Sequence, residues 1–514
     1  MKIVLSTIIL FGVWVTTFAQ TPFNKLYDFD GKYSQLHGES LAEIDGIFYT
    51  AGVAIESFDS IEFNRNLCVA SFDSEGEPLN SIVWLNDIAN IQNTVSKNNE
   101  YLLYQDHIYY AVESHGANRP CIIKVNKNLT ELDRYTCIED GDSQLLFPVS
   151  MTEFPKDNLL IPLINEQTRL EQLVARMSLQ DSSDWEIKDI TVPGQLTLPA
   201  KAFKLPEENK VILAGLYAEL INGQGQNPNN KIGLYLTIID ENLDVLDRKY
   251  YFDNINTVGQ DMDGLINEQG EIIMTMKTFD RPLWNSTFQF KYRPAVVKLN
   301  PDLSVAWNKP FSRSEYGDST EQHVAIIETH AKDGYIITGF SNWENYGMIG
   351  RIDLNGDSVW HYKVKSLYQD NNNRLKDVIR TSDGNYLASG SRGVYTEDDS
   401  LSSFVQLWLF KFDEDGQVIN VGTTATEEII DSESGVTIYP NPASDIIYIK
   451  QETPNRIKYD FYDNNGRLLH SKWHTDGNQI LFFEVDDYPD GMYQLIASDK
   501  TGSVVEVKKI VIQH

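Results

Sequence analysis

The chain has 514 residues, 41% of them hydrophobic and 23% charged, which is typical of a folded protein and too long for a single small core. Asp and Glu number 74 against 43 Lys and Arg, giving a formal net charge of −31. A field of that sign repels phosphates, so nucleic acid and anionic lipid are not expected partners. An acidic balance that serves only solubility is the simpler interpretation of the same numbers.

The first residues predict a secretory signal peptide covering residues 1–19. Lys2 supplies a positive charge, residues 3–18 are almost entirely apolar or small, and Ala19 is a small residue suited to cleavage before Gln20. A membrane anchor is the alternative, although the apolar run is short for a bilayer span. We therefore expect an exported chain whose mature part has no transmembrane segment.

A pattern of short strands and tight turns recurs over residues 21–422. Each turn starts with Asp or Asn, carries Asp, Asn or Glu two residues later, and has Gly or Leu at its fourth position. Asp and Asn favour such turns because their side chains accept hydrogen bonds from the backbone two residues on. A degenerate copy lies near Leu179, and the six clear turns begin at Asp73, Asn126, Asp240, Asn300, Asp353 and Asp413.

Each unit also contains an apolar, β-rich run that closes on glycine, as in residues 46–52, 210–215, 334–339 and 384–390. With one strand before this run and two around the tight turn, a unit holds four short antiparallel strands. Seven such units predict an all-β, seven-bladed β-propeller, because radial stacking buries both faces of each sheet and leaves only short edges. An array of β-sandwiches is the alternative fold.

Residues 23–27 resemble the fourth strand of later units, but they precede the first unit. We expect this spare strand to pair with the last unit and close the ring. The units as a whole resemble the loose repeats of many secreted bacterial propellers, with residues 333–335 and 383–386 as the best matches. That resemblance implies an architecture and no reaction, since one fold hosts many functions.

Only three cysteines occur, so no disulfide framework is expected. Cys121 and Cys137 lie symmetrically about Leu129, and across a hairpin they would face each other at a spacing that a disulfide can span. The alternative is that both of them and Cys68 are buried, inert thiols.

The composition changes after Gly422. Residues 423–434 are polar and acidic and read as a linker. Residues 435–514 alternate short apolar strands with turn residues, which predicts a small β-sandwich of immunoglobulin-like type.

Residues 435–514 also resemble the type A sorting domain of the type IX secretion system. A Tyr-Pro-Asn-Pro opening, an Asn-Gly turn, a Pro-x-Gly-x-Tyr strand and a basic last strand follow in the family's order: Tyr439, Pro440, Asn441, Pro442, Gly466, Gly491, Tyr493, Lys508 and Lys509. Asp490 stands where the family often has Ala or Glu. The resemblance implies recognition by the outer-membrane translocon, removal of the domain, and a secreted or surface-attached product. A sandwich used only for binding is the alternative.

No nucleophile motif, phosphate loop or metal spacing is recognisable, so neither a catalytic site nor a cofactor is expected. Asp353, Asn355 and Asp357 have the spacing of a calcium loop, but they coincide with one of the repeat turns, which explains them without a metal. Calcium at this turn stays an alternative.

The longest expected loops join the second strand to the third and one unit to the next, and in a propeller both kinds lie on one face. That face would carry aromatic residues among Asn, Asp and Ser, a composition that suits binding of protein or glycan: Phe58, Tyr217, Trp284, Tyr292, Trp343, Tyr346 and Tyr395. Ordinary loop composition is the simpler interpretation. We expect a non-enzymatic binding platform. Because paired carboxylates cannot be recognised from sequence, a glycan lyase or hydrolase stays an alternative, as does a structural surface component.

Overall fold

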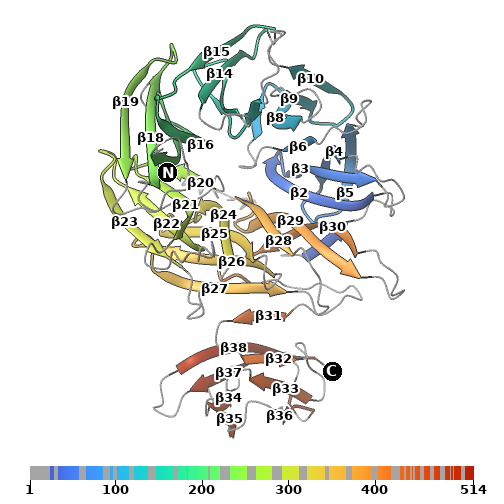
Figure 1. Cartoon of the computed structure of the whole chain (residues 1–514). Helices are drawn as coiled ribbons and strands as arrows, with labels where there is room; N and C mark the ends of the chain where they lie inside the picture. The colour runs from blue at the N-terminus through green and yellow to red at the C-terminus, as the bar shows by residue number, and fades with distance from the viewer. Residues whose placement is uncertain are drawn as a thin grey trace, which may run out of the picture.

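The structure is a computed structural model. It describes residues 24–27, 33–56, 65–84, 93–95, 101–114, 121–136, 146–165, 171–181, 183–205, 209–219, 232–251, 262–279, 292–311, 321–341, 346–365, 373–395, 403–417, 429–432, 436–439, 443, 446–451, 457–462, 468–474, 481–486, 488–489, 491–498 and 504–513. Every regular element in these ranges is a β-strand, so the all-β prediction is confirmed. Figure 1 shows the strands in short sheets around a centre, with a smaller group of strands set apart.

Three sheets each contain four consecutive antiparallel strands. The first is β16 (Gln195–Lys204), β17 (Lys210–Glu219), β18 (Ile232–Asp240) and β19 (Val245–Tyr251). The second is β20 (Asp263–Ile266), β21 (Ile272–Phe279), β22 (Tyr292–Leu299) and β23 (Val305–Pro310). The third is β24 (Glu321–Glu328), β25 (Gly334–Ser341), β26 (Tyr346–Asp353) and β27 (Ser358–Lys365).

Two further sheets have an inner edge made of two short strands. In one, β6 (Asn93–Val95) and β7 (Tyr101–Tyr104) both pair with β8 (His107–Ser114), followed by β9 (Cys121–Asn126) and β10 (Leu132–Thr136). In the other, β11 (Leu146–Pro148) and β12 (Thr152–Glu153) both pair with β13 (Asn158–Asn165), followed by β14 (Gln172–Ser178) and β15 (Trp185–Asp189).

The eight-stranded sheet consists of two groups of four strands. One group is β2 (Tyr33–Ile44), β3 (Ile47–Glu56), β4 (Arg65–Phe72) and β5 (Pro78–Trp84). The other is β28 (Arg374–Arg380), β29 (Tyr386–Tyr395), β30 (Ser403–Phe412) and the N-terminal strand β1 (Asn24–Tyr27). A single parallel pair, Gln35 with Val405, joins the groups. β1 runs antiparallel to β30, which confirms the expected pairing of the N-terminal segment with the last unit.

The recurring tight turns have one geometry. In the first, the Asp73 carboxylate accepts hydrogen bonds from the backbone N–H groups of Glu75 and Glu77, at 2.9 and 2.8 Å. The fourth residue has a positive φ in all six clear turns, and in three of them it is a leucine: Leu129, Leu243 and Leu303. A left-handed leucine is strained, and its burial offsets that cost, since Leu243 is fully buried.

A β-bulge in the first strand of four groups explains the closing glycines. The pairing shifts by one residue at Gly38/Ser40, Pro199/Lys201, His323/Ala325 and Leu375/Asp377. The bulge brings a carbonyl oxygen over the neighbouring glycine. A Cβ on Gly339 would lie 1.9 Å from the Gln322 oxygen, and one on Gly390 would lie 1.8 Å from the Arg374 oxygen. Only glycine fits there.

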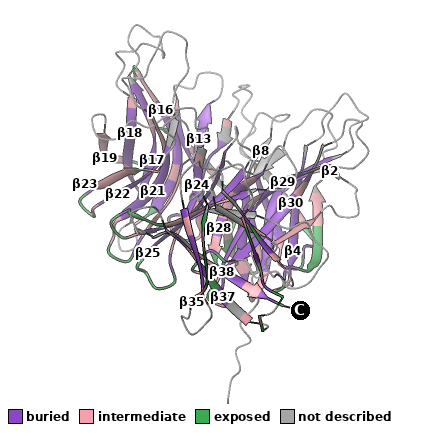
Figure 2. Cartoon of the chain, turned by 90° about the horizontal axis from the view of Figure 1, so that it is seen from below, coloured by how far each residue is buried: buried purple, intermediate pink, exposed green. Residues whose placement is uncertain are grey.

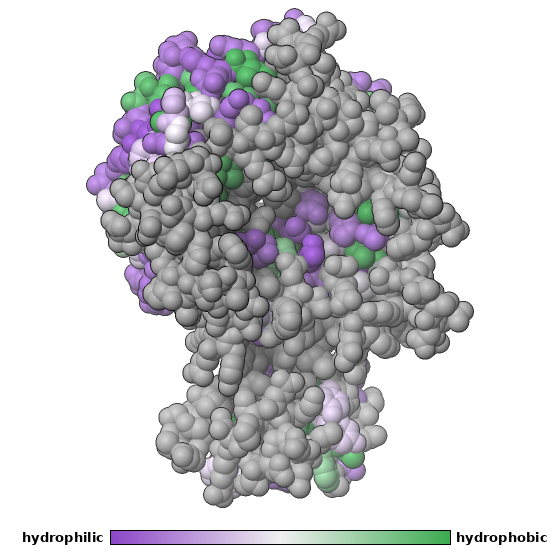
Figure 3. Space-filling view, in the orientation of Figure 1, coloured by the Kyte–Doolittle hydropathy of each residue, from purple (hydrophilic) through white to green (hydrophobic). Residues whose placement is uncertain are grey.

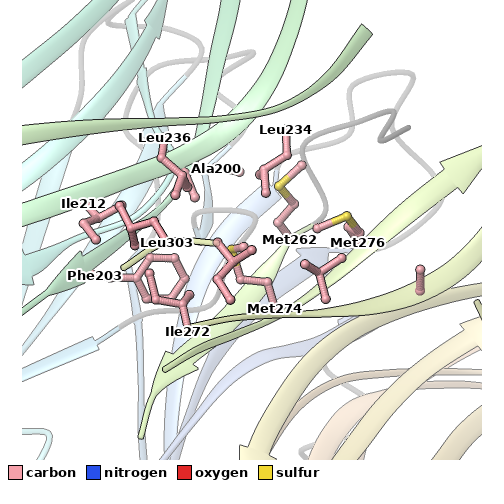
Figure 4. Packing of buried hydrophobic residues seen from close by; sticks show 14 residues of the cluster. Ala200, Phe203, Ile212, Leu234, Leu236, Met262, Ile272, Met274, Met276 and Leu303 are labelled. Atoms are coloured by element: carbon pink, nitrogen blue, oxygen red, sulfur yellow. The ribbon is translucent and has the colours of Figure 1, made fainter. Parts of the chain in front are cut away.

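The apolar cores lie between neighbouring groups. One cluster combines Phe203, Ile212 and Leu236 of β16–β18 with Ile272 and Met274 of β21, as Figure 4 shows. Figure 2 shows buried residues along the strands of the ring, and exposed residues at several of its turns. Radially stacked sheets bury both faces in this way.

The C-terminal residues form two sheets around one core. The first sheet is β32 (Val436–Tyr439), β33 (Ile446–Gln451) and β36 (Leu481–Glu484), and the second is β35 (Leu468–His474), β34 (Ile457–Tyr462), β37 (Gly491–Ser498) and β38 (Val504–Ile512). Both contribute to one buried cluster, for example Ile447 and Phe461. Within the expected linker, β31 (Ile429–Ser432) pairs with β27. The described residues contain no helix long and apolar enough to cross a membrane.

Candidate functional site

Two of the seven aromatic residues expected on the binding face have described side chains, and both are buried. Tyr217, near the end of β17, is 5% exposed and packs against Tyr250, with 4.9 Å between ring centroids. Tyr346, at the start of β26, is 1% exposed, and Lys363 Nζ lies 4.6 Å from its ring centroid. These two tyrosines pack against side chains of β19 (Tyr217) and β27 (Tyr346).

The other five aromatic residues lack described side chains. Tyr292 and Tyr395 lie in β22 and β29. Phe58, Trp284 and Trp343 lie outside the described residues. The expectation of an aromatic loop face therefore stays a prediction for these positions.

Polar side chains are buried near the strand ends from which the long connections leave. Gln172, at the start of β14, is fully buried and donates through Nε2 to the Tyr235 hydroxyl at 2.9 Å. Asn165 at the end of β13 and Ser341 at the end of β25 are also buried. Figure 3 shows hydrophilic residues at the hollow centre of the ring. Gln172, Asn165 and Ser341 are at most 3% exposed, so they are polar groups of the interior and do not form a surface that a ligand reaches.

Two cations flank Phe340 where three groups of strands meet. The Arg374 guanidinium and Lys376 Nζ of β28 each lie 5.1 Å from the Phe340 ring centroid. Lys376 Nζ also lies 3.6 Å from a carboxylate oxygen of Glu39 in β2. Burial lowers the pKa of Arg374, and the Glu39 charge opposes that shift. We call these four residues the Phe340 cluster. The Phe340 ring is itself buried, at 3% exposure, so the cluster places charges of both signs over a packed aromatic ring.

Asp377 connects β28 to β2 beside this cluster. Its Oδ2 accepts the backbone N–H of Leu41 at 2.7 Å, and its Oδ1 accepts the N–H of Val378 at 2.8 Å. Burial raises the pKa of Asp377 to about 8, and the charge of Asp263 adds to that shift, while the two N–H groups and Lys201 oppose it. A raised carboxyl pKa is a feature of general acids, but these contacts also join two strands.

Asp263 makes the matching connection between β20 and β24. Its Oδ2 accepts the backbone N–H of Ile326 at 2.9 Å, and its Oδ1 accepts Lys201 Nζ of β16 at 2.7 Å. In both cases a carboxylate on the first strand of one group binds the backbone of the next first strand. Joining two first strands is sufficient to explain both carboxylates, Asp377 and Asp263.

The sequence carried one signal for this region. Lys376 and Asp377 are adjacent charges inside an otherwise β-rich run, and this pattern could have pointed to it.

A cavity of about 180 Å³ opens between β23 and the sheet of β24–β27, with Lys309, Phe311, Trp360 and His361 among its lining residues. The fully buried His323 lies behind it, with ring centroids 5.5 Å from Phe311 and 6.1 Å from His361. Burial lowers the pKa of His323 to about 3, and His361 adds to the shift. His323 Nδ1 has no hydrogen-bond partner among the described residues.

The candidate calcium turn uses its oxygens within the protein. Asp353 Oδ1 accepts the backbone N–H groups of Asn355 and Asp357, both at 2.8 Å. Asp357 Oδ1 accepts Lys309 Nζ of β23 at 2.6 Å. These contacts match the tight-turn interpretation of the three residues. Elsewhere in the described part of the chain, no group of three or more metal-ligating side chains gathers.

The cysteine register differs by one residue from the symmetric hairpin expected. Cys121 pairs with Thr136, since β9 and β10 are centred between Asn128 and Leu129. Cys137 lies outside the described residues, so the disulfide stays a prediction. Cys68 is buried and is not part of a disulfide.

Four of the expected sorting-signal residues have described side chains. Tyr439 of β32 is half-buried, and Tyr493 of β37 is buried and donates to the Pro489 carbonyl at 2.8 Å. In β38, Lys508 is half-buried and Lys509 is exposed. Gly491 begins β37. The remaining expected residues lie outside the described part: Pro440, Asn441, Pro442 and Gly466, together with Ala19 and Gln20 of the cleavage site.

Residues 437–513 match the family model of the secretion system C-terminal sorting domain. The protein is therefore a cargo of the type IX secretion system, exported to the cell surface or the extracellular space. This confirms the export route expected from the tail. A comparison with curated proteins finds no match.

Solved structures similar to this chain include a hydrazine synthase of Kuenenia stuttgartiensis, with 11% identity, a TM-score of 0.41, and coverage of 74% of this chain and 95% of the other. A quinohemoprotein alcohol dehydrogenase of Comamonas testosteroni has 8% identity, a TM-score of 0.41, and coverage of 80% and 78%. An α-L-arabinofuranosidase of Fusarium graminearum has 12% identity, a TM-score of 0.38, and coverage of 60% and 91%. Similarity at this level carries no argument about activity.

Proposed function

We propose that residues 21–422 form a closed, seven-bladed β-propeller followed by an immunoglobulin-like sorting domain. Seven groups of strands support the blade number: β2–β5, β6–β10, β11–β15, β16–β19, β20–β23, β24–β27, and β28–β30 with β1. Each consecutive pair of groups shares a buried apolar cluster. The last group shares one with the first, where Leu407 and Leu409 pack with Phe48. Seven strands in two sheets around one core support the immunoglobulin-like sandwich.

We further propose that the propeller is a non-enzymatic platform that binds protein or glycan. The Phe340 cluster is the observation that carries this proposal. Lys376 and Glu39 are 23% and 20% exposed, so a ligand can reach both charges. The buried Phe340 ring supports these charges from below, and accessible charges of both signs close together suit recognition of a polar protein or glycan surface.

A glycan and protein array probed with the exported protein tests the platform. Binding without turnover is the expected result. The variant Lys376→Gln should weaken binding at least tenfold, since one charged contact contributes about 1.5–3 kcal/mol. The exposed residue Leu246 on β19 provides the control, and Leu246→Ala should bind like the wild type. Equal affinity of Lys376→Gln and the wild type would place the site elsewhere.

Two outcomes of the array favour other functions. Product formation would identify a glycan lyase or hydrolase, for which Asp377, with its raised pKa, is the first residue to substitute. If the array shows no binding and no turnover, the result favours a structural surface component. The double variant Trp284→Ala with Trp343→Ala tests the loop face: lost binding with Lys376→Gln unaffected would move the site from the Phe340 cluster to the loops.

A further inference from the structure

Three aromatic side chains lie side by side on the three-stranded sheet of the sorting domain. Tyr439 of β32 pairs with Tyr448 of β33, and Tyr448 pairs with Phe482 of β36. The ring centroids of Tyr439 and Tyr448 are 5.6 Å apart. Successive side chains of a strand point to opposite faces, and the neighbours Ile447 and Phe483 are in the core. The three aromatics, here called the aromatic ladder, therefore lie on the outer face.

The aromatic ladder is accessible. Tyr448 is 37% exposed and Phe482 is 45% exposed. The exposed large hydrophobic residues described on the propeller occupy separate strands or turns, such as Leu79, Leu103 and Leu246. Single exposed hydrophobics are ordinary on a protein surface, whereas adjacent ones indicate an interaction site.

The outer face of the other sheet in this domain has a different character. Lys458 and the buried Asp460, two residues apart along β34, form an ion pair of 2.9 Å. The exposed Gln494 of β37 pairs with the exposed Lys509 of β38. Trp473 of β35, which is 44% exposed, pairs with Lys458 and therefore lies on this same face. This face thus has one exposed aromatic among charged and amide side chains, whereas the aromatic ladder has three adjacent aromatics and is the better suited to a protein partner.

We propose that the aromatic ladder is the surface through which the sorting domain docks on a protein of the type IX export machinery. The identity of the binding partner follows from the domain itself, because residues 437–513 match a sorting domain and include all three residues of the aromatic ladder. Lys472 lies at its edge, with Nζ 2.6 Å from the Phe482 carbonyl and 5.0 Å from the Phe482 ring centroid. The partner surface should therefore be apolar at its centre and acidic at its rim.

Site-specific photo-crosslinking in a bacterium with type IX secretion tests the contact on the full-length precursor. A photoreactive phenylalanine replaces Tyr448 or Phe482, and a matched control carries it at the exposed Trp473 of β35. Crosslinks from the two ladder positions to a machinery protein, at least fivefold above the Trp473 position, are expected. Crosslinks to a second copy of the chain, equal crosslinking from Trp473, or no crosslink from the ladder would overturn the proposal.

Export of variants gives an independent measurement. Tyr448→Ser combined with Phe482→Ser should lower the amount of exported protein at least fivefold and leave precursor in the periplasm. Trp473→Ser should export normally, and Tyr448→Phe with Phe482→Leu should restore export, because the ladder stays apolar. Normal export of the double serine variant would contradict the proposal. If that variant does not fold, as judged by protease digestion of the precursor, the crosslinking result decides.

Discussion

Tyr27 of β1 donates a hydrogen bond to the carbonyl oxygen of Gly76, in the tight turn of the first group of strands. Burial, together with the charges of Glu77 and Asp73, raises the pKa of Tyr27, so its hydroxyl stays a donor. Trp360 of β27 makes the corresponding contact with the Glu414 carbonyl, at 3.1 Å. β1 thus contacts the first group as β27 contacts the next one.

Removal of residues 21–30 should lower the melting temperature by about 5 °C or more, since β1 and its contacts are lost. Tyr27→Phe removes only the hydroxyl and should cost about 1 kcal/mol. Calorimetry of the two variants and the wild type measures both effects. An unchanged melting temperature after the deletion would show that β1 does not hold the ring closed.

Gly339→Ala should destabilise the protein by about 3 kcal/mol, because its Cβ meets the Gln322 carbonyl of the bulged strand. Gly350→Ala in the same sheet is the matched control. Its Cβ would meet side-chain atoms of His361 and Ile337 at 3.0 and 3.2 Å, and these can move. Denaturant titration compares the two variants. Equal losses would contradict the assignment of the closing glycine to the bulge.

His323 should make the protein less stable in acid. Its pKa is about 3 when folded and about 6.5 when unfolded, so the unfolded chain binds the proton more readily between these values. The free energy of unfolding should fall by up to about 1.4 kcal/mol for each pH unit below about 6.5. His323→Gln should reduce this slope, measured by urea titration at pH 7, 6 and 5. An unchanged slope in His323→Gln would assign the acid sensitivity to other groups.

Asp377 should make the protein less stable as the pH rises, which is the opposite of the effect of His323. Its pKa is raised to about 8 in the folded protein from 3.8, so the folded state holds the proton more tightly within that window. Its contribution to stability is then present below pH 3.8 and is lost as the pH rises toward 8. Asp377→Asn should weaken the decline of stability between pH 5 and pH 8 in urea titrations. A decline as steep as in the wild type would assign the effect to another group.

Calcium should leave the melting temperature unchanged, because Asp353 and Asp357 are held by backbone N–H groups and Lys309. Melting curves with excess calcium and with a chelator measure this. A melting temperature that rises by several degrees with calcium in the wild type, and does not rise in Asp357→Asn, would establish a metal site at this turn.

The repeat period and the turn chemistry could be predicted because they depend on local residues. Asp73 and its counterparts hydrogen-bond within four residues, so their pattern is visible in a single unit. The Phe340 cluster could not be predicted in this way. Phe340, Arg374 and Glu39 lie on three different groups of strands, and only the closure of the ring brings them together.

Two details show why register must come from tertiary structure. Cys121 faces Thr136, one residue from the position that symmetry about Leu129 gives, because the turn offsets its two strands by one residue. Tyr217 and Tyr346 read as loop aromatics in the sequence, yet both are buried, because their strands extend further toward the loops than the pattern indicates.

By itself, the sequence determined the export route and the repeating unit, since a sorting tail and a turn are both written in contiguous residues. The sequence also indicated that the N-terminal strand pairs with the last unit, but only the tertiary structure gave its register on β30. Tertiary structure alone decided that Gly339 lies under a bulge, and that Tyr439, Tyr448 and Phe482 form one surface. Each of these depends on which strands become neighbours. The exact register of a strand pairing depends on segments that can lie far apart in the chain, and no local pattern specifies that register.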